Sequence, residues 1–150
     1  MLSRRLTQLI AANQIAGAVW VVVAALAFGV HSSSSELVLA VIIALATLVG
    51  GVLALRNSRR GIAALTAVLV LQVIRFADAS FAWQFYLGAT WRVTLRPVFG
   101  TDFGFEGLFS VSPWPVGGGS LLELNLTALL AAAYLVSQIW RSRGTRAQSG

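Results

Sequence analysis

Four long apolar stretches constrain the fold of this chain more than any other feature of its sequence. Each is close to the 20 or so residues that an α-helix needs to cross a hydrocarbon core of about 30 Å. We place them at Leu9–Val30, Leu37–Leu55, Ile62–Phe81 and Leu121–Trp140. The pattern predicts an all-α integral membrane protein, a bundle of four transmembrane helices with a structured extracytoplasmic loop between the third and fourth helices.

The composition indicates that lipid is the solvent for most of the surface. Hydrophobic residues make up 57% of the 150 residues and charged residues only 11%, whereas about a quarter of a soluble globular domain is charged. A chain of this length usually forms one domain. Residues 1–150 are therefore expected to form a single membrane domain.

The arginines predict the orientation of this domain. All eleven basic residues are arginines, and eight of them would lie on one side of a four-span protein: Arg4, Arg5, Arg56, Arg59, Arg60, Arg141, Arg143 and Arg146. Segments with such an excess usually lie in the cytoplasm. The sequence thus predicts a multi-pass protein of a bacterial inner membrane with both termini in the cytoplasm. An outer loop is expected over about residues 88–119, and a disordered tail over about residues 142–150.

Polar residues interrupt the third and fourth stretches at five positions: Gln72, Arg75, Asp78, Glu123 and Asn125. A charge at mid-bilayer costs about 2.5–3.5 kcal/mol on insertion scales, so each needs a partner or a use. Arg75 and Asp78 are spaced to pair on one helix. Two interpretations stay open: a buried ion pair that locks two helices, and an outward-facing polar pocket for a ligand, lipid headgroup or ion. In the first stretch, Asn13 and Gln14 are expected to make interhelical hydrogen bonds.

The segment after the third stretch is rich in glycine and aromatic residues. Its WRVTLR motif, Trp91–Arg96, alternates apolar and polar residues with the period of a half-buried strand. The part that follows fits a short hairpin or an interfacial helix. Five aromatic residues there need cover: Phe99, Phe103, Phe105, Phe109 and Trp114. We expect a structured cap that packs on the outer mouth of the bundle or on a partner.

The sequence carries little catalytic chemistry. It has no cysteine, one histidine and five acidic residues, and it contains no phosphate-binding glycine motif or metal-ligand spacing. We expect no cofactor, metal or nucleic-acid partner, and no residue is assigned a catalytic role. The leading hypothesis is a non-enzymatic helical membrane subunit that acts by association, in a homo-oligomer or with other membrane subunits, in contact with membrane lipid. The alternative is a small transporter, channel or ligand- or lipid-binding protein that uses the polar cluster, and an enzyme acting on lipid is a third hypothesis.

Overall fold

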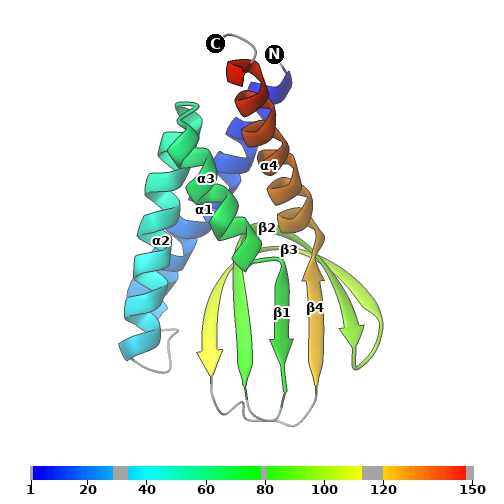
Figure 1. Cartoon of the computed structure of the whole chain (residues 1–150). Helices are drawn as coiled ribbons and strands as arrows, with labels where there is room; N and C mark the ends of the chain where they lie inside the picture. Colours follow the sequence, from blue (N-terminus) through cyan, green and yellow to red (C-terminus); the bar gives the residue numbers. More distant parts are fainter. Residues whose placement is uncertain (1, 29–33, 79–80, 113–119, 148–150) are drawn as a thin grey trace.

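A computed structural model describes the backbone of residues 2–28, 34–78, 81–112 and 120–147, with side chains for residues 4–27, 38–78, 81–107 and 120–141. Within these residues the chain forms four helices and four strands (Figure 1): α1 Leu2–Phe28, α2 Ser34–Leu55, α3 Arg59–Leu71, β1 Ile74–Ala77, β2 Ala82–Arg96, β3 Gly100–Ser112, β4 Leu121–Asn125 and α4 Leu126–Ala147. Helices α3 and α4 lie above the sheet in this view, and both chain ends lie at the end of the helices remote from it.

The prediction of an all-α bundle of four transmembrane helices is wrong, because an antiparallel sheet replaces part of the third and fourth predicted spans. The third span is α3, a helix of 13 residues, followed by β1. At 1.5 Å per residue α3 is about 20 Å long, which is too short to cross hydrocarbon. The fourth span begins as β4 and continues as α4. Among the described residues, two helices are long and apolar enough to cross a membrane by length and composition, over Arg4–Ala27 and Val38–Leu55.

A change of period explains where the helical prediction failed. In β1, Ile74 and Phe76 are exposed while Arg75 lies between them on the other face, as the two-residue period of a strand requires. In β4, Glu123 and Asn125 are buried together with the same period. A criterion of length and hydropathy joins each short strand to the neighbouring helix and counts both as one span. At the other end of the chain, α4 continues to Ala147, so most of the tail expected to be disordered is helical.

The helices pack through small residues. One core shared by the four helices contains Ala11 of α1, Ala54 of α2, and Ala128 and Ala132 of α4, all nearly inaccessible to solvent. Where α2 meets α3, a Cβ on Gly61 would fall on the backbone of Leu53 and Ala54. Close approach of backbones at small residues is how helices pack where the surroundings supply no hydrophobic drive.

The four strands form a sheet in which β2 is the longest element. It pairs with β3 along almost its whole length, from Ala82↔Ser112 to Thr94↔Gly100, so the outer loop expected over residues 88–119 is largely a hairpin. The opposite edge of β2 pairs first with β1, at residues 82–83, and then with β4, at residues 92–96. Because β1 and β4 also pair with each other, the strands β1, β2 and β4 close a ring. Strand β2 belongs both to this ring and to the β2–β3 hairpin, which forms an arch (Figure 1).

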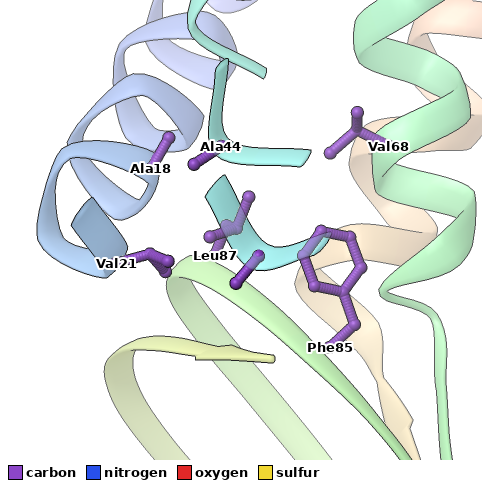
Figure 2. Packing of buried hydrophobic residues seen from close by; sticks show 7 residues of the cluster. Ala18, Val21, Ala44, Val68, Phe85 and Leu87 are labelled. Atoms are coloured by element: carbon purple, nitrogen blue, oxygen red, sulfur yellow. The ribbon is translucent and has the colours of Figure 1, made fainter. Parts of the chain in front are cut away.

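Helix α1 crosses the hairpin at very short range. A Cβ on Gly17 would fall on the backbone of Leu87 and Gly88, and Gly88 has a positive φ of 82° that favours glycine. Beside this crossing, Phe85 and Leu87 point from β2 into a core with Ala18 and other small side chains of the helices (Figure 2). The first half of the hairpin is thereby fixed beneath the helices.

Candidate functional site

Alternation along the strands gives the sheet two chemically different faces. From residue 83 to residue 94 of β2, odd positions are apolar, while even positions hold glutamine, tyrosine, glycine, threonine and arginine. The register pairs even residues of β2 with even residues of β3, so both strands share the same two faces. We call the side with the even residues the inner face, because the ring of β1, β2 and β4 closes around it, and the other side the outer face.

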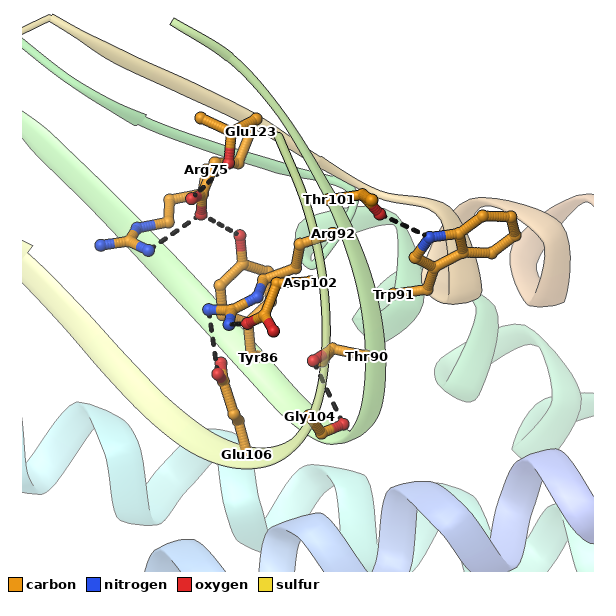
Figure 3. A network of polar contacts seen from close by, with 11 residues as sticks. Arg75, Tyr86, Thr90, Trp91, Arg92, Thr101, Asp102, Gly104, Glu106 and Glu123 are labelled. Atoms are coloured by element: carbon orange, nitrogen blue, oxygen red, sulfur yellow. Dashed lines mark hydrogen bonds and ion pairs between the residues drawn. The ribbon is translucent and has the colours of Figure 1, made fainter. Parts of the chain in front are cut away.

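Glu123 is the centre of the inner face. It lies in β4 directly opposite Arg75 of β1 and Thr94 of β2. Arg75 Nη1 donates to Glu123 Oε2 at 2.8 Å (Figure 3). The Thr94 hydroxyl donates to Oε1 at 3.0 Å. The Tyr86 hydroxyl reaches across the ring and donates to Oε2 at 3.3 Å. Both oxygens of this buried carboxylate therefore have donors.

Arg92 forms a second ionic group on the same face. It pairs with Asp102, which is opposite it in β3, and its Nη1 lies 2.9 Å from Glu106 Oε1 (Figure 3). Its guanidinium also lies over the Tyr86 ring, 5.8 Å from the centroid. Burial lowers the pKa of Arg92, but the hydrogen bond to Asp102 and the charges of Glu106, Asp102 and Glu123 outweigh this effect and raise it.

Tyr86 joins the two ionic groups, since it contacts both Glu123 and Arg92. Burial raises the pKa of Tyr86, and the neighbouring Glu123 carboxylate raises it further, so the phenol stays protonated far into the alkaline range. Three buried polar atoms of the face have no hydrogen-bond partner in the described part of the chain, namely Arg75 Nε, Arg92 Nε and Glu106 Oε2. The same part of the chain contains no group of three His, Cys, Asp or Glu side chains that could hold a metal ion.

Amide side chains from the helices form a separate network at the middle of β2. Gln14 Nε2 donates to the Leu87 carbonyl at 3.0 Å, and the Leu87 N–H donates to Gln72 Oε1 at 2.9 Å. Gln72 Nε2 closes the circuit by donating to Gln14 Oε1 at 2.6 Å. The Ala89 N–H donates to Asn13 Oδ1 at 2.8 Å. These amides are hydrogen-bond partners for backbone groups of β2 between the residues that pair with β1 and those that pair with β4.

The structure brings together only part of the predicted polar cluster. Arg75 and Glu123 pair directly, but Gln72 belongs to the amide network. Asn125 Oδ1 accepts from the Ala128 N–H at 3.2 Å at the start of α4, and Asp78 Oδ1 accepts from the Phe81 N–H at 2.8 Å in the turn after β1. The helical spacing behind the expected Arg75–Asp78 pair is absent, because residue 75 lies in a strand.

Three residues of the predicted aromatic cap lie in the part of the hairpin from the Ala89↔Phe105 pair through the turn that joins β2 to β3, which we call the far half of the hairpin. Phe99, Phe103 and Phe105 are 75%, 71% and 54% exposed, and the Phe103 ring stacks on Trp91 with centroids 5.3 Å apart. Most of the surface of these three side chains is therefore not covered by the rest of the molecule. The backbone of Phe109 lies opposite Phe85 in β3. The Phe109 side chain and all of Trp114 lie outside the described residues.

Sequence reasoning missed most of the inner face: Tyr86, Arg92, Thr94, Asp102 and Glu106. The signal was present, because the alternation seen in Trp91–Arg96 extends back to Trp83. Folding that strand back around the turn after Arg96 places the acids of β3 opposite and near Arg92.

No protein-family model matches this chain, and no curated protein or solved structure matches it either. A functional proposal therefore depends on the chemistry of the residues themselves.

Proposed function

We propose that the protein is a non-enzymatic membrane subunit, anchored by α1 and α2, that acts by self-association through the far half of its hairpin. The observation that carries this proposal is the contrast between the two faces of the same strands. The charges of the inner face pair with one another, whereas the outer face leaves Trp91, Phe103 and Phe105 exposed. Exposed apolar patches of this kind mark interaction surfaces.

Membrane anchoring is supported by the outer surfaces of the two long helices. Many apolar side chains there are about half exposed or more: Leu9, Val19, Trp20, Val23 and Leu26 on α1, and Val38, Ile42, Leu45 and Val49 on α2. Such a surface is unfavourable in water by roughly 25 cal/mol per Å². The arginine-bearing ends of the helices would lie on the cytoplasmic side and the sheet toward the opposite side.

A polypeptide fits the far half of the hairpin better than lipid does. The last strand in the sheet order is β3, and no described strand pairs with its outer edge. Alternate N–H and C=O groups of such an edge point away from the sheet and need partners. Lipid covers aromatic rings but supplies no backbone partners. A second copy supplies both, because two β3 edges can pair antiparallel around a two-fold axis.

The rival function, a transporter, channel or ligand-binding protein, would use the inner face. There Glu123 already accepts from three donors, and Arg92 already pairs with two acids. A ligand could bond the three unpartnered atoms of this face, but to take the place of Glu123, Asp102 or Glu106 it would have to break an existing ion pair, which is costly in a partly buried site. The geometry supports a structural use of these charges.

Cross-linking in bilayers tests the proposal. The chain has no cysteine, so single cysteines introduced by mutation are unambiguous. Thr101→Cys, on the exposed part of β3, should form a disulfide between two copies on mild oxidation. Val70→Cys, an exposed position on α3, should not. Disulfides that form equally at both positions would indicate random collision instead of an interface.

A matched pair of variants distinguishes dimerisation through the hairpin from nonspecific hydrophobic association. Phe103→Ser with Phe105→Ser should convert dimers to monomers and leave the thermal stability of the monomer nearly unchanged, since both side chains are exposed within one copy. Leu129→Ser with Leu130→Ser, on the exposed side of α4, should leave the dimer intact. Extraction of the wild type by alkaline carbonate, or a monomer at all protein-to-lipid ratios, would contradict the proposal.

A further inference from the structure

The end of the helices remote from the sheet contains a cavity of about 330 Å³, which we call the arginine cavity. It is lined by Arg4 and Thr7 of α1, Asn57 of the α2–α3 turn, Arg59 and Ile62 of α3, and Gln138 and Ile139 of α4. Three helices and a turn thus meet around one space, at the end where Figure 1 shows both chain termini. A volume near 300 Å³ lies at the small end of ligand pockets, so it suits a headgroup and not a whole lipid.

The charge around this cavity is of one sign. The arginines of this end are Arg4, Arg5, Arg56, Arg59, Arg60, Arg141, Arg143 and Arg146. The five acidic residues of the sequence are Glu36, Asp78, Asp102, Glu106 and Glu123. Four of these belong to the sheet and its connections, and Glu36 lies at the opposite end of α2, about 30 Å from Arg56 along the helix. By sequence position, eight arginines and none of the five acidic residues belong to this end, so its side chains carry a net positive charge.

The lining groups are those that bind phosphate. Two guanidinium groups, from Arg4 and Arg59, supply forked donors that match the geometry of phosphate oxygens. The amides of Asn57 and Gln138 and the hydroxyl of Thr7 add neutral donors, and no acidic side chain lines the space. Asn57 is held in the turn with a positive φ of 56°, a conformation that asparagine tolerates better than most residues.

We propose that the arginine cavity binds a phosphate group, that of an anionic lipid headgroup. Arg4 begins the first apolar helix segment, so in a membrane the cavity lies at the level of the headgroups. The isoleucines on its wall would face the glycerol and the first methylenes. The choice of lipid over free phosphate rests on the proposed membrane anchoring, whereas the recognition of phosphate does not.

The test uses the full chain in nanodiscs of phosphatidylcholine, with or without phosphatidylglycerol. Phosphatidylglycerol should raise the thermal stability of the wild type and should be retained as a bound lipid in native mass spectra. Arg4→Gln with Arg59→Gln should weaken this binding by about ten-fold or more, since each lost charge-assisted hydrogen bond has a large effect. The control, Arg5→Gln with Arg60→Gln, removes the same charge next to the cavity but not from its lining, and should weaken binding by less than about two-fold.

Two further arms keep every outcome informative. Arg4→Lys with Arg59→Lys preserves the charge and nearly the volume but removes the two forked guanidinium donors, and should bind phosphatidylglycerol with intermediate affinity. This variant also serves as the test if Arg4→Gln with Arg59→Gln folds poorly. Inorganic phosphate added to phosphatidylcholine nanodiscs should stabilise the wild type less than phosphatidylglycerol does. Equal stabilisation would assign the cavity to free phosphate and overturn the choice of lipid. Equal losses in the cavity variant and its control, or no response to either anion, would overturn the site, whereas carbonate extraction of the wild type would overturn only the membrane anchoring.

Discussion

The helical half and the sheet half of this protein bury opposite kinds of side chain. Between the helices the core consists largely of alanine, as at Ala11, Ala54 and Ala132. Inside the ring of strands the buried Glu123 pairs with the partly buried Arg75 and accepts from the buried Tyr86 hydroxyl. Yet both halves expose large apolar residues, such as Leu26 on α1 and Phe103 on β3. The two halves are thus alike in exposing apolar side chains and differ in how their interiors are filled.

The two halves meet at side chains that belong to neither kind of core. Asn13, Gln14 and Gln72 extend from helices and bond the backbone of β2 as a neighbouring strand would. Three amides thus take the place of the strand that β2 lacks between its pairings with β1 and β4. They explain why apolar helices carry neutral polar residues at these positions.

The largest effect is expected where α1 crosses the hairpin and joins the halves. Gly17→Ala would place a Cβ on the backbone of Gly88, and neither backbone can move without separating the helix from the sheet. We expect a loss of more than about 5 kcal/mol, or failure to fold. Gly100→Ala is the control, since nothing lies within 4 Å of its Cβ position. Unfolding in mixed detergent micelles should leave the control near the wild type. A folded Gly17→Ala protein would mean that the two halves are held together elsewhere.

The second effect tests the charged interior of the sheet. Glu123→Leu removes the acceptor of Arg75, Thr94 and Tyr86 and should cost about 3 kcal/mol, because it leaves a partly buried cation and two hydroxyl groups without their partner. Arg75→Leu should cost less, since Glu123 keeps its bonds from Thr94 and Tyr86. The double variant should be more stable than Glu123→Leu alone. Additive losses in this cycle would show that the two residues do not interact.

The sequence predicts the helical half of this fold better than the sheet half. Helices α1 and α2 were expected as helices because each contains one uninterrupted apolar run, although α1 begins at Leu2, well before the predicted start at Leu9. The strands β1 and β4 were not, because four or five alternating residues next to a helix do not change a hydropathy average taken over 20. The period of the apolar residues, and not the hydropathy averaged over such a window, distinguishes these strands from the helices.

The sequence indicated which polar residues interrupt the apolar stretches, but not how they pair. Arg75 and Glu123, two of the five residues expected in one polar cluster, form an ion pair, whereas helical spacing had predicted a pair between Arg75 and Asp78. Arg92 meets Asp102 only through the register of the hairpin, which one residue of slip would abolish. Side chains that meet across a ring, as Tyr86 and Glu123 do, have no local signature at all.

A third prediction concerns the amides at the junction. Gln72→Leu leaves the buried Leu87 N–H and one group of Gln14 without their partners, and should cost about 1–3 kcal/mol. Gln84→Leu, at a half-buried position of the same strand, should cost less. Amide hydrogen exchange at Leu87 should also speed up in the first variant and not in the second. Unchanged exchange at Leu87 would mean that Gln72 does not bond the strand.

The smallest effect is expected at Tyr86, and its signature is a dependence on pH. Tyr86→Phe removes one hydrogen bond of 3.3 Å to Glu123 and should cost about 0.5–1.5 kcal/mol near neutral pH. Burial raises the pKa of Tyr86 in the folded protein above the ordinary value of about 10. Above that pH the unfolded chain loses the phenolic proton first, so the folded state binds more protons and its stability falls as pH rises. This contribution is complete below pH 10 or so and fades at higher pH, and Tyr86→Phe should make the alkaline loss of stability less steep. Equal slopes in Tyr86→Phe and the wild type would mean that Tyr86 is not buried against Glu123.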